Sequence, residues 1–271
     1  MPAKFKDEAA RFFGENAKRR SPQPVLKLLK GYMPKEGGRP TAPKYAPAYK
    51  TESGRICEGL NPEKFWQRLE LVKDLPKGTI LELHAGAGNL TEAVYKGKAK
   101  KHILVEKDPD ELDKALEKVS NGVMVEGYAM DNIKWIRDYM DPDELKDLVL
   151  VDFDPFGSPA DVMKEFFSKY KVRKPLRVAV TDGGHVFLSR LSGSERGRKW
   201  LKEHYLVDTY PSTREKLAET MDKFMEKLGE KYGFKAKRVN YAHGPRVNLS
   251  LIHISEPTRP LYISYAVFCL K

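Results

Sequence analysis

Residues Thr79 to Tyr95, with the sequence TILELHAGAGNLTEAVY, give the clearest indication of the fold. The largely apolar start of this stretch predicts a buried strand, and its end predicts a helix. Gly86 and Gly88 lie between the two, where residues without a Cβ atom let the backbone turn tightly and approach a ligand. Ligands of open α/β sheets bind at the carboxyl ends of the strands. The stretch therefore predicts a strand, a ligand-binding turn and a helix.

Strands and helices alternate on both sides of this stretch. Besides Thr79–Leu83, the candidate strands are His102–Glu106, Gly122–Val125, Leu148–Phe153, Leu176–Thr181 and Ala236–Tyr241. The candidate helices are one that begins at Pro62, then Asn89–Lys96, Pro109–Val119, Asp131–Tyr139, Pro159–Tyr170, Glu195–Glu203 and one that follows a capping box of Ser212 and Glu215. Such alternation favours an α/β fold, in which an open parallel sheet carries helices on both faces.

A carboxylate follows the glycine turn at a spacing that suits a ribose. Glu106 ends the next candidate strand, 20 residues after Gly86, and a carboxylate at this place can accept hydrogen bonds from both ribose hydroxyls. The turn lacks the third glycine of dinucleotide-binding proteins, because it continues as Gly-Ala-Gly-Asn-Leu-Thr. A pyrophosphate against the helix N-terminus is therefore disfavoured. Of the possible functions, an NAD-binding oxidoreductase is therefore the one that the turn favours least.

A second polar motif follows the candidate strand Leu148–Phe153, and its sequence is Asp154-Pro155-Phe156-Gly157. Pro155 has no N–H group and a fixed φ, so it ends the strand and stiffens the loop. The Asp154 carboxylate and the Pro155 carbonyl oxygen are two acceptors that together can orient one NH₂ group, and Phe156 can stack on a base. Because an exocyclic base amine is a poor nucleophile, such alignment would supply most of the help toward its methylation.

Together the two motifs resemble those of class I S-adenosylmethionine-dependent methyltransferases. The segment from Glu82 to Gly88 is similar to their motif I, E-x-x-x-G-x-G, and Asp154 to Gly157 is similar to motif IV of the amino-methyltransferases. The resemblance implies a Rossmann-like class I methyltransferase sheet and S-adenosylmethionine as the cofactor, with no metal. The implied cofactor-binding residues are Glu82, Ala85, Gly86, Gly88, Glu106 and Asp131, and the implied catalytic residues are Asp154, Pro155 and Phe156.

The resemblance gives each of these cofactor-binding residues a role. The turn that includes Ala85 would cradle the methionine moiety, and Glu82 would hold this turn and the amino-acid end of the cofactor. Glu106 would bind the ribose, and Asp131 would contact the adenine amino group. Asp131 also fits the N-cap of the following helix, which is the alternative for this residue.

The six residues from Asp154 to Pro159, DPFGSP, resemble more narrowly the tRNA (guanine-N2)-dimethyltransferase family. This resemblance implies direct transfer of a methyl group to guanine N2 in tRNA. It covers roughly Thr79–Asp182, and the residues around Thr181 and Asp182 depart from the family pattern. The nearest alternative is a DNA or other RNA amino-methyltransferase that acts on adenine N6 or cytosine N4. A non-catalytic, methyltransferase-like protein that binds nucleic acid is an alternative of another class.

The charge distribution favours a polyanionic partner. The formal net charge is +11, and residues 1–50 hold 12 Lys and Arg against 4 Asp and Glu. Residues 1–60 form a basic arm rich in Pro and Gly, with Tyr32, Tyr45 and Tyr49 between lysines. Such an arm suits the bases and phosphates of tRNA or another nucleic acid; a solubilising leader or a strap packed on the domain is the alternative. Cations after the fifth strand are candidate phosphate contacts or members of a solvated loop: Arg190, Arg196, Arg198 and Lys199.

Other features of the composition point to the cytoplasm. No apolar run reaches the roughly 18–20 residues that a membrane helix needs, and the N-terminus has no apolar stretch typical of a signal peptide. The two cysteines, Cys57 and Cys269, provide neither a disulfide framework nor a zinc cluster.

The last 23 residues, Leu249–Lys271, resemble the in-frame translation of a sequencing adapter. The part LSLIHISEPTR is similar to a transposon end, and ISYAVFCLK is similar to a flow-cell primer that runs into poly-A. We therefore expect residues 61–248 to form the methyltransferase domain and residues 249–271 to be a non-native tail. The alternating pattern LSLIHIS is nevertheless typical of a strand. The last strand of the sheet is therefore expected to be lost or mimicked by the tail, and a genuine C-terminal strand is the alternative.

Overall fold

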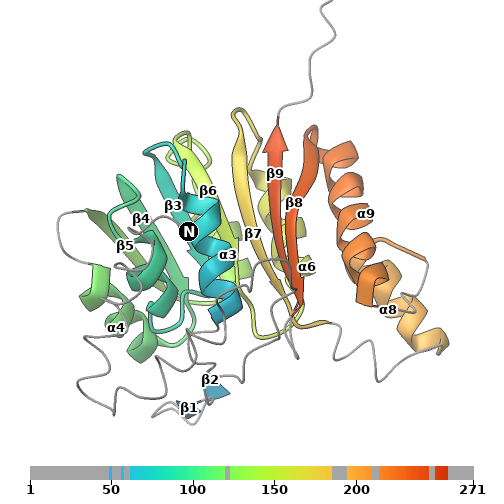
Figure 1. The fold of residues 1–271 in the computed structure, drawn as a ribbon, viewed down its shortest axis with the longest axis horizontal. Coiled ribbons are helices and arrows are strands. Elements are labelled where there is room, and N and C mark those ends of the chain that lie inside the picture. Colours follow the sequence, from blue (N-terminus) through green and yellow to red (C-terminus); the bar gives the residue numbers. More distant parts are fainter. Residues whose placement is uncertain are drawn as a thin grey trace, which may run out of the picture.

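The fold is a mixed α/β sheet with helices on both faces, as Figure 1 shows. It is given by a computed structural model that describes residues 49–50, 56–57, 62–119, 123–184, 194–208, 214–243 and 248–255. The main sheet has seven strands in the order β5-β4-β3-β6-β7-β9-β8. Their bounds are β3 (Thr79–Leu83), β4 (Lys101–Glu106), β5 (Met124–Ala129), β6 (Leu148–Phe153), β7 (Leu176–Asp182), β8 (Lys235–His243) and β9 (Asn248–Ser255).

The chain changes direction at the middle of this sheet. From β3 it moves outward to β4 and β5, and it then crosses to β6 and moves outward again to β7. These five strands are parallel, whereas β9 is antiparallel to both β7 and β8. The carboxyl ends of β3, β4 and β6 therefore meet where the strand order reverses, which is the usual ligand site of such sheets. These ends lie at the lower edge of the sheet in Figure 1.

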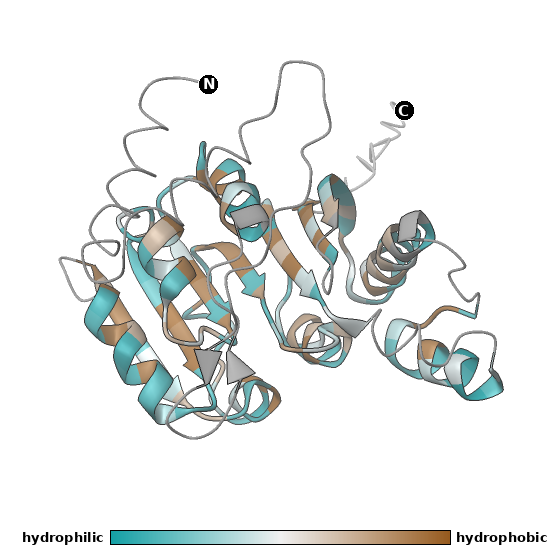
Figure 2. Cartoon of the chain, turned by 60° about the horizontal axis from the view of Figure 1, so that its bottom comes forward, coloured by the Kyte–Doolittle hydropathy of each residue, from teal (hydrophilic) through white to brown (hydrophobic). Residues whose placement is uncertain are grey.

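Helices cover both faces of the sheet and shield its apolar strands. The helices are α3 (Pro62–Val72), the π-helix η1 (Thr91–Tyr95), α4 (Pro109–Val119), α5 (Asn132–Asp138), α6 (Ala160–Lys169), α8 (Glu195–Tyr205) and α9 (Arg214–Tyr232). Side chains of α3 and η1 share one core with the sheet, and α4 packs beside them. Side chains of α5, α6, α8 and α9 share the core of the other face. In Figure 2 the hydrophobic residues are concentrated in the strands, between helices of mixed character.

The central strand β6 illustrates why these residues form this sheet. All six of its side chains are buried, and it pairs with β3 on one side and β7 on the other. Strands that are covered on both faces need such continuous apolar runs. The exception within the run is Asp152, a carboxylate that needs buried partners.

The α/β fold predicted from the sequence is confirmed, and most predicted elements lie within two residues of the observed ones. The bounds of the third strand were wrong: β5 begins at Met124 and continues to Ala129. The prediction ended at Val125 because polar residues break the apolar run there, but β5 is an edge strand whose side chains are only partly buried. The helix predicted at Asn89–Lys96 is the shorter π-helix η1.

The structure describes only parts of the predicted basic arm and of the predicted non-native tail. Most of the arm predicted for residues 1–60, and Ser212 of the predicted capping box, lie outside the described residues. Within the arm, β1 (Tyr49–Lys50) and β2 (Ile56–Cys57) pair as a small antiparallel sheet. Residues 249–255, the first part of the predicted non-native tail, form most of β9. The origin of that tail stays a prediction. No described helix is long and apolar enough to cross a membrane.

Candidate active site

Three strand ends that the sequence singled out lie side by side. The Gly86 amide donates a hydrogen bond to Glu106 Oε2 at 2.9 Å, which joins the turn after β3 to the end of β4. The Asp154 amide donates to the Leu83 carbonyl oxygen at 3.2 Å, which joins the loop after β6 to the same turn. The glycine turn, the Glu106 carboxylate and the loop that begins at Asp154 therefore lie together at the carboxyl ends of the strands.

The two glycines of the turn serve different purposes. Both have a positive φ, +54° at Gly86 and +67° at Gly88, which side chains rarely adopt. A Cβ atom at Gly88 would lie 2.7 Å from Ala115 of α4, so this glycine lets the turn pack against that helix. A Cβ atom at Gly86 would have nothing within 4 Å. Gly86 thus faces open space beside Glu106, where a ligand could approach the backbone.

The carboxylate of Glu106 is fixed by backbone groups. Its Oε2 accepts from Gly86, and its Oε1 accepts from the Asp108 amide at 3.0 Å. A carboxylate offers about four lone-pair sites, so an oxygen that accepts from an amide can also accept from a ribose hydroxyl. The predicted residue Ala85 also belongs to this region, because its amide donates to the Val105 carbonyl of β4.

Glu82 and Asp131 occupy different surroundings. Glu82 is buried in the core and accepts from the Thr91 hydroxyl of η1 at 2.9 Å, so it holds the element that follows the turn. Burial raises the pKa of this carboxyl group. Asp131 is exposed and caps α5, because its Oδ1 accepts from the amides of Ile133 and Lys134. The N-cap alternative for Asp131 is therefore observed, and its contact with an adenine stays a prediction.

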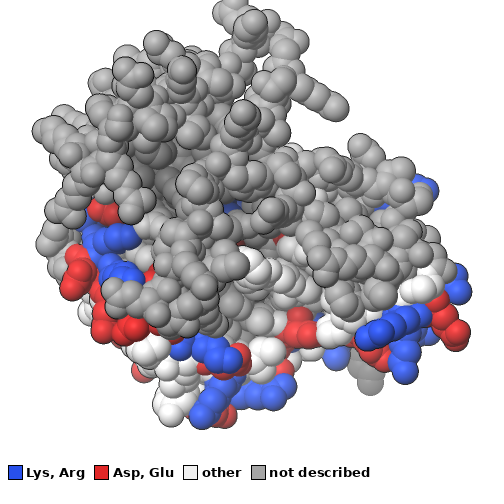
Figure 3. Space-filling model, turned by 90° about the horizontal axis from the view of Figure 1, so that it is seen from below, with Lys and Arg blue, Asp and Glu red and all other residues white. Residues whose placement is uncertain are grey.

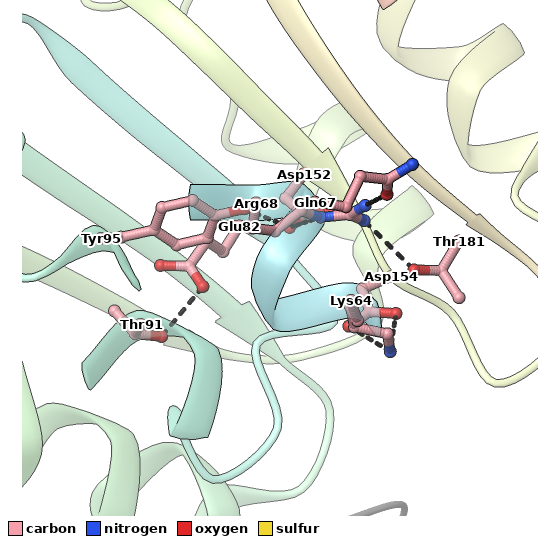
Figure 4. A network of polar contacts seen from close by, with 9 residues as sticks. All are labelled: Lys64, Gln67, Arg68, Glu82, Thr91, Tyr95, Asp152, Asp154 and Thr181. Carbon is pink, nitrogen blue, oxygen red and sulfur yellow. Dashed lines mark hydrogen bonds and ion pairs between the residues drawn. The ribbon is translucent and has the colours of Figure 1, made fainter. Parts of the chain in front are cut away.

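The DPFGSP loop presents a charged acceptor and an exposed ring. Asp154 follows β6 and accepts from Lys64 Nζ at 2.7 Å and 3.0 Å, as Figure 4 shows. Burial opposes ionisation of Asp154, but Lys64 and then Arg68 outweigh it, so the pKa of Asp154 is lowered. Phe156 is 78% exposed. The loop therefore offers an anionic acceptor beside an aromatic surface that is free to stack.

A buried polar network lies next to Asp154 and is centred on Asp152, two residues earlier in the chain. Arg68 donates to both oxygens of Asp152, at 3.0 Å and 2.8 Å, and its NH2 group also donates to the Thr181 hydroxyl at 3.2 Å. The Tyr95 hydroxyl donates to Asp152 as well. Figure 4 shows that these side chains come from α3, η1, β6 and β7. The network fixes α3 against the end of β6 and thereby fixes the position of Lys64.

This chain has a Rossmann-like fold that it shares with a solved methyltransferase. Trm1 from Pyrococcus horikoshii, solved with S-adenosyl-L-methionine, superposes with a TM-score of 0.54 at 14% identity, over 73% of this chain and 56% of that chain. TYW2 from P. horikoshii, solved with MeSAdo, gives 0.45 at 16% identity over 76% and 69%. The putative methyltransferase yhhF from Escherichia coli gives 0.47 at 13% identity over 74% and 93%. No protein-family profile and no curated protein sequence matches the chain. The chain spans little more than half the length of Trm1.

The loops after β6 and β7 are linked by hydrogen bonds. The Tyr205 hydroxyl of α8 donates to Asp182 Oδ1 at 2.8 Å and accepts from the Ser158 hydroxyl at 2.9 Å. The Gly183 amide donates to the Gly157 carbonyl oxygen at 2.9 Å. Asp182, noted in the sequence together with Thr181, is thus linked through Tyr205 to the loop that carries Phe156.

His84 lies in the glycine turn between the ends of β4 and β6. Its φ of +71° is unusual for a residue other than glycine, and its Nδ1 atom is buried with no hydrogen-bond partner in the described part of the chain. Burial lowers the pKa of its imidazole, although the carboxylates of Asp154, Glu106 and Asp131 act in the opposite direction. A neutral imidazole therefore lies among the three predicted carboxylates.

The described surface at this edge is mixed in charge. Figure 3 views the molecule from this edge and shows Lys and Arg side chains interspersed with Asp and Glu. Arg196, Arg198 and Lys199 lie on α8, whereas Arg190 lies outside the described residues. The excess of Lys and Arg in residues 1–50 also belongs to a segment that is mostly not described. The nucleic-acid partner therefore stays a prediction from the sequence.

The sequence interpretation missed Lys64, Arg68, Asp152 and Tyr205. Lys64 and Arg68 lie on the helix that begins at Pro62, where the spacing of the apolar residues Phe65, Leu69 and Val72 predicts only the buried face. Asp152 did give a usable signal, since a carboxylate inside an apolar strand requires a buried cation or donor. Its partner Arg68 is 84 residues away in the chain, and no local pattern identifies a contact of that range.

Proposed function

We propose that this chain is an S-adenosylmethionine-dependent RNA methyltransferase that acts on an exocyclic base amine, with guanine N2 of tRNA as the first target. The observation that carries the proposal is that Gly86, Glu106 and Asp154 share one site through the hydrogen bonds described above. The fold similarity to Trm1, which was solved with S-adenosyl-L-methionine, supports the choice of cofactor. The DPFGSP sequence supports an amine as the acceptor and tRNA as its source.

The residues at the glycine turn fit this cofactor. The open space at the missing Cβ of Gly86 leaves room for a ligand against the backbone, and Glu106 is aligned beside it to accept ribose hydroxyls. The turn has no third glycine for a pyrophosphate, which this cofactor lacks. When bound, S-adenosylmethionine supplies an activated methyl group.

The loop after β6 then orients the amine. Asp154 is ionised at neutral pH because Lys64 and Arg68 lower its pKa, so its carboxylate accepts one N–H of the amine. The Pro155 carbonyl oxygen accepts the second N–H, and Phe156 stacks on the base. The nitrogen lone pair is thereby aimed at the methyl group. Transfer would form the new N–C bond while the S–CH₃ bond of S-adenosylmethionine breaks, with S-adenosylhomocysteine as the leaving group, and the nitrogen would give up one proton to Asp154 or to water.

The decisive experiment identifies the methylated nucleoside. The protein is incubated with labelled cofactor and with tRNA, ribosomal RNA or duplex DNA, and each nucleic acid is then digested to nucleosides. We expect label in N2-methylated guanosine from tRNA. Label in methyladenine or methylcytosine alone would remove the guanine assignment. Absence of label from every nucleic acid, together with absence of cofactor binding by calorimetry, would contradict the proposal as a whole.

A pair of variants tests the role of Asp154. We expect Asp154→Ala to lower kcat on the order of a hundredfold, because the amine loses an aligned acceptor, while cofactor binding by calorimetry stays close to that of the wild type. The matched control is Asp147→Ala, which removes an exposed carboxylate just before β6, at the opposite end of the same strand. Equal kcat values for the two variants would contradict the assignment of Asp154.

A further inference from the structure

Lys64 already donates to the carboxylate that the proposed mechanism assigns to the substrate amine. It lies in the first turn of α3, and its Nζ atom is 2.7 Å from one oxygen of Asp154 and 3.0 Å from the other. Its position does not depend on a flexible surface chain, because Arg68, one helical turn later, fixes α3 to Asp152 with two hydrogen bonds. The helix therefore delivers two cations to two carboxylates at the end of β6.

Both members of the pair are largely withdrawn from water. The side chain of Lys64 is 9% exposed, and that of Asp154 is 19% exposed. A carboxylate in such surroundings is strongly disfavoured without a partner, and it avoids this cost by taking up a proton. A protonated Asp154 would present an O–H donor and would be a poorer acceptor for an amine N–H. The protonation state of Asp154 therefore decides whether this site can orient an amine.

The other elements around Asp154 cannot replace Lys64 fully. Arg68 of α3 lowers the pKa of Asp154 less than Lys64 does, and it already pairs with Asp152. From β7, Thr181 contributes a weaker, neutral hydrogen bond. In the turn after β3, the imidazole of His84 interacts electrostatically with Asp154, but burial lowers the pKa of that imidazole. Lys64 is thus the main source of the positive charge that keeps Asp154 ionised.

We propose that Lys64 is a positioning residue of this site, which keeps the Asp154 carboxylate ionised and aims it at the amine of the substrate. The assignment rests on the proposed function in so far as an amine is the substrate. A carboxylate has about four lone-pair sites, of which Lys64 uses two and Thr181 a third, so one remains for an N–H of the amine. The amine therefore joins Lys64 at the carboxylate and does not have to displace it.

The first measurement needs no methyl transfer. The Asp154 carboxyl carbon is titrated by NMR in protein labelled with ¹³C-aspartate, and its signal is assigned from the Asp154→Asn variant. In Lys64→Met we expect the pKa of Asp154 to rise by about one unit or more, because desolvation is then opposed only by weaker partners. Lys64→Arg keeps the charge and should keep the wild-type titration. Lys64→Gln, which keeps a donor but not the charge, serves if Lys64→Met does not fold, and it should also raise the pKa.

The second measurement is the pH dependence of kcat/KM for RNA. From about pH 5 to about pH 8 we expect the wild type, Lys64→Arg and the control Lys174→Met to share one profile. Lys174 makes a comparable 3.0 Å ion pair with Asp147, but on the surface at the other end of β6. For Lys64→Met or Lys64→Gln, an acidic limb should move upward into this range.

The outcomes separate the two proposals. An unchanged Asp154 titration with a loss of activity that is uniform across pH would mean a merely structural role for Lys64, and the inference would be overturned. A raised Asp154 pKa in a protein that methylates no nucleic acid would leave Lys64 as the group that ionises Asp154. That outcome would refute the proposed function instead.

Discussion

A single residue, Asp182, makes the free energy of unfolding of this protein depend on pH. Its carboxyl group is buried at the end of β7, and its Oδ1 accepts from Tyr205 and from the Gly184 amide at 2.7 Å. Burial raises the pKa of Asp182 from 3.8 to about 6, because these neutral donors compensate only partly for lost water. The folded chain therefore binds this proton more tightly than the unfolded chain does. Its free energy of unfolding falls as the pH rises from about 4 to about 6.

The variant Asp182→Asn tests this effect. An asparagine oxygen can accept from both donors but cannot ionise. The free energy of unfolding of the variant should therefore not show the fall of about 2 kcal/mol that the wild type shows over this pH range. The measurement is urea unfolding of both proteins at about pH 4.5 and about pH 7. The control is Asp147→Asn, because Lys174 lowers the pKa of Asp147 and the shift there has the opposite sign. Parallel pH dependences of the wild type and Asp182→Asn would disprove the account.

Single residues also mark where sequence reasoning succeeds and where it ends. The adjacency of Gly86, Glu106 and Asp154 could be predicted, because each follows a strand and parallel strands bring their carboxyl ends together. The ion pair of Lys64 and Asp154 could not, since it joins residues 90 positions apart. It depends on how α3 is rotated over the sheet. That rotation follows from the packing of whole side chains, which a spacing pattern does not contain.

At the scale of elements, α8 holds together the loops that follow β6 and β7. Its Tyr205 hydroxyl bridges Ser158 of the DPFGSP loop and Asp182 of the next loop. The ring of Tyr205 is held against Phe224 of α9 and Trp200 of its own helix. The loop that presents Phe156 is therefore supported by a helix that comes later in the chain.

Removal of this hydroxyl should loosen both loops. For Tyr205→Phe we expect a loss of about 1–3 kcal/mol in the free energy of unfolding, because buried groups lose a partner. We also expect faster hydrogen exchange at the Gly183 amide, which bonds to Gly157 across the two loops. The control is Tyr170→Phe, which removes a hydroxyl from a buried ring just after the other end of α6. If both variants leave the exchange at Gly183 unchanged, α8 does not fasten the loops.

Elements differ in how well the sequence predicts them. The bounds of β3, α4 and β6 were predicted exactly as observed, because each has a clear apolar pattern with Gly, Pro or charged residues at its ends. The predicted bounds of the third strand and of the helix after the glycine turn were less accurate. An edge strand lacks a full apolar run, and the five residues of η1 are too few for a helical period to appear.

At the scale of the whole molecule, the sheet depends on its last strand. β9 lies between β7 and β8 and pairs with both. Its buried apolar side chains are Leu249, Leu251, Ile252 and Ile254. Burial of each contributes about 1.5–3 kcal/mol, so together they match the net stability of about 5–15 kcal/mol that a typical domain has.

A chain that ends at Asn248 should therefore lose cooperative unfolding. It lacks almost all of β9, which leaves β8 without its described partner and exposes the edge of β7. The comparison is a chain that ends at Ser255 and keeps the strand, and both are measured by thermal unfolding followed by circular dichroism. Equal midpoints for the two chains would show that the sheet does not need β9.

The place of β9 also has a consequence for biosynthesis. The ribosome makes β8 before β9, yet β9 must be inserted between β8 and β7. Until β9 has left the exit tunnel, β8 lacks its described partner strand, and β7 carries an open sheet edge that invites aggregation. The interval between the synthesis of β8 and the release of β9 from the ribosome is therefore when this chain would most need chaperones that cover unpaired strands.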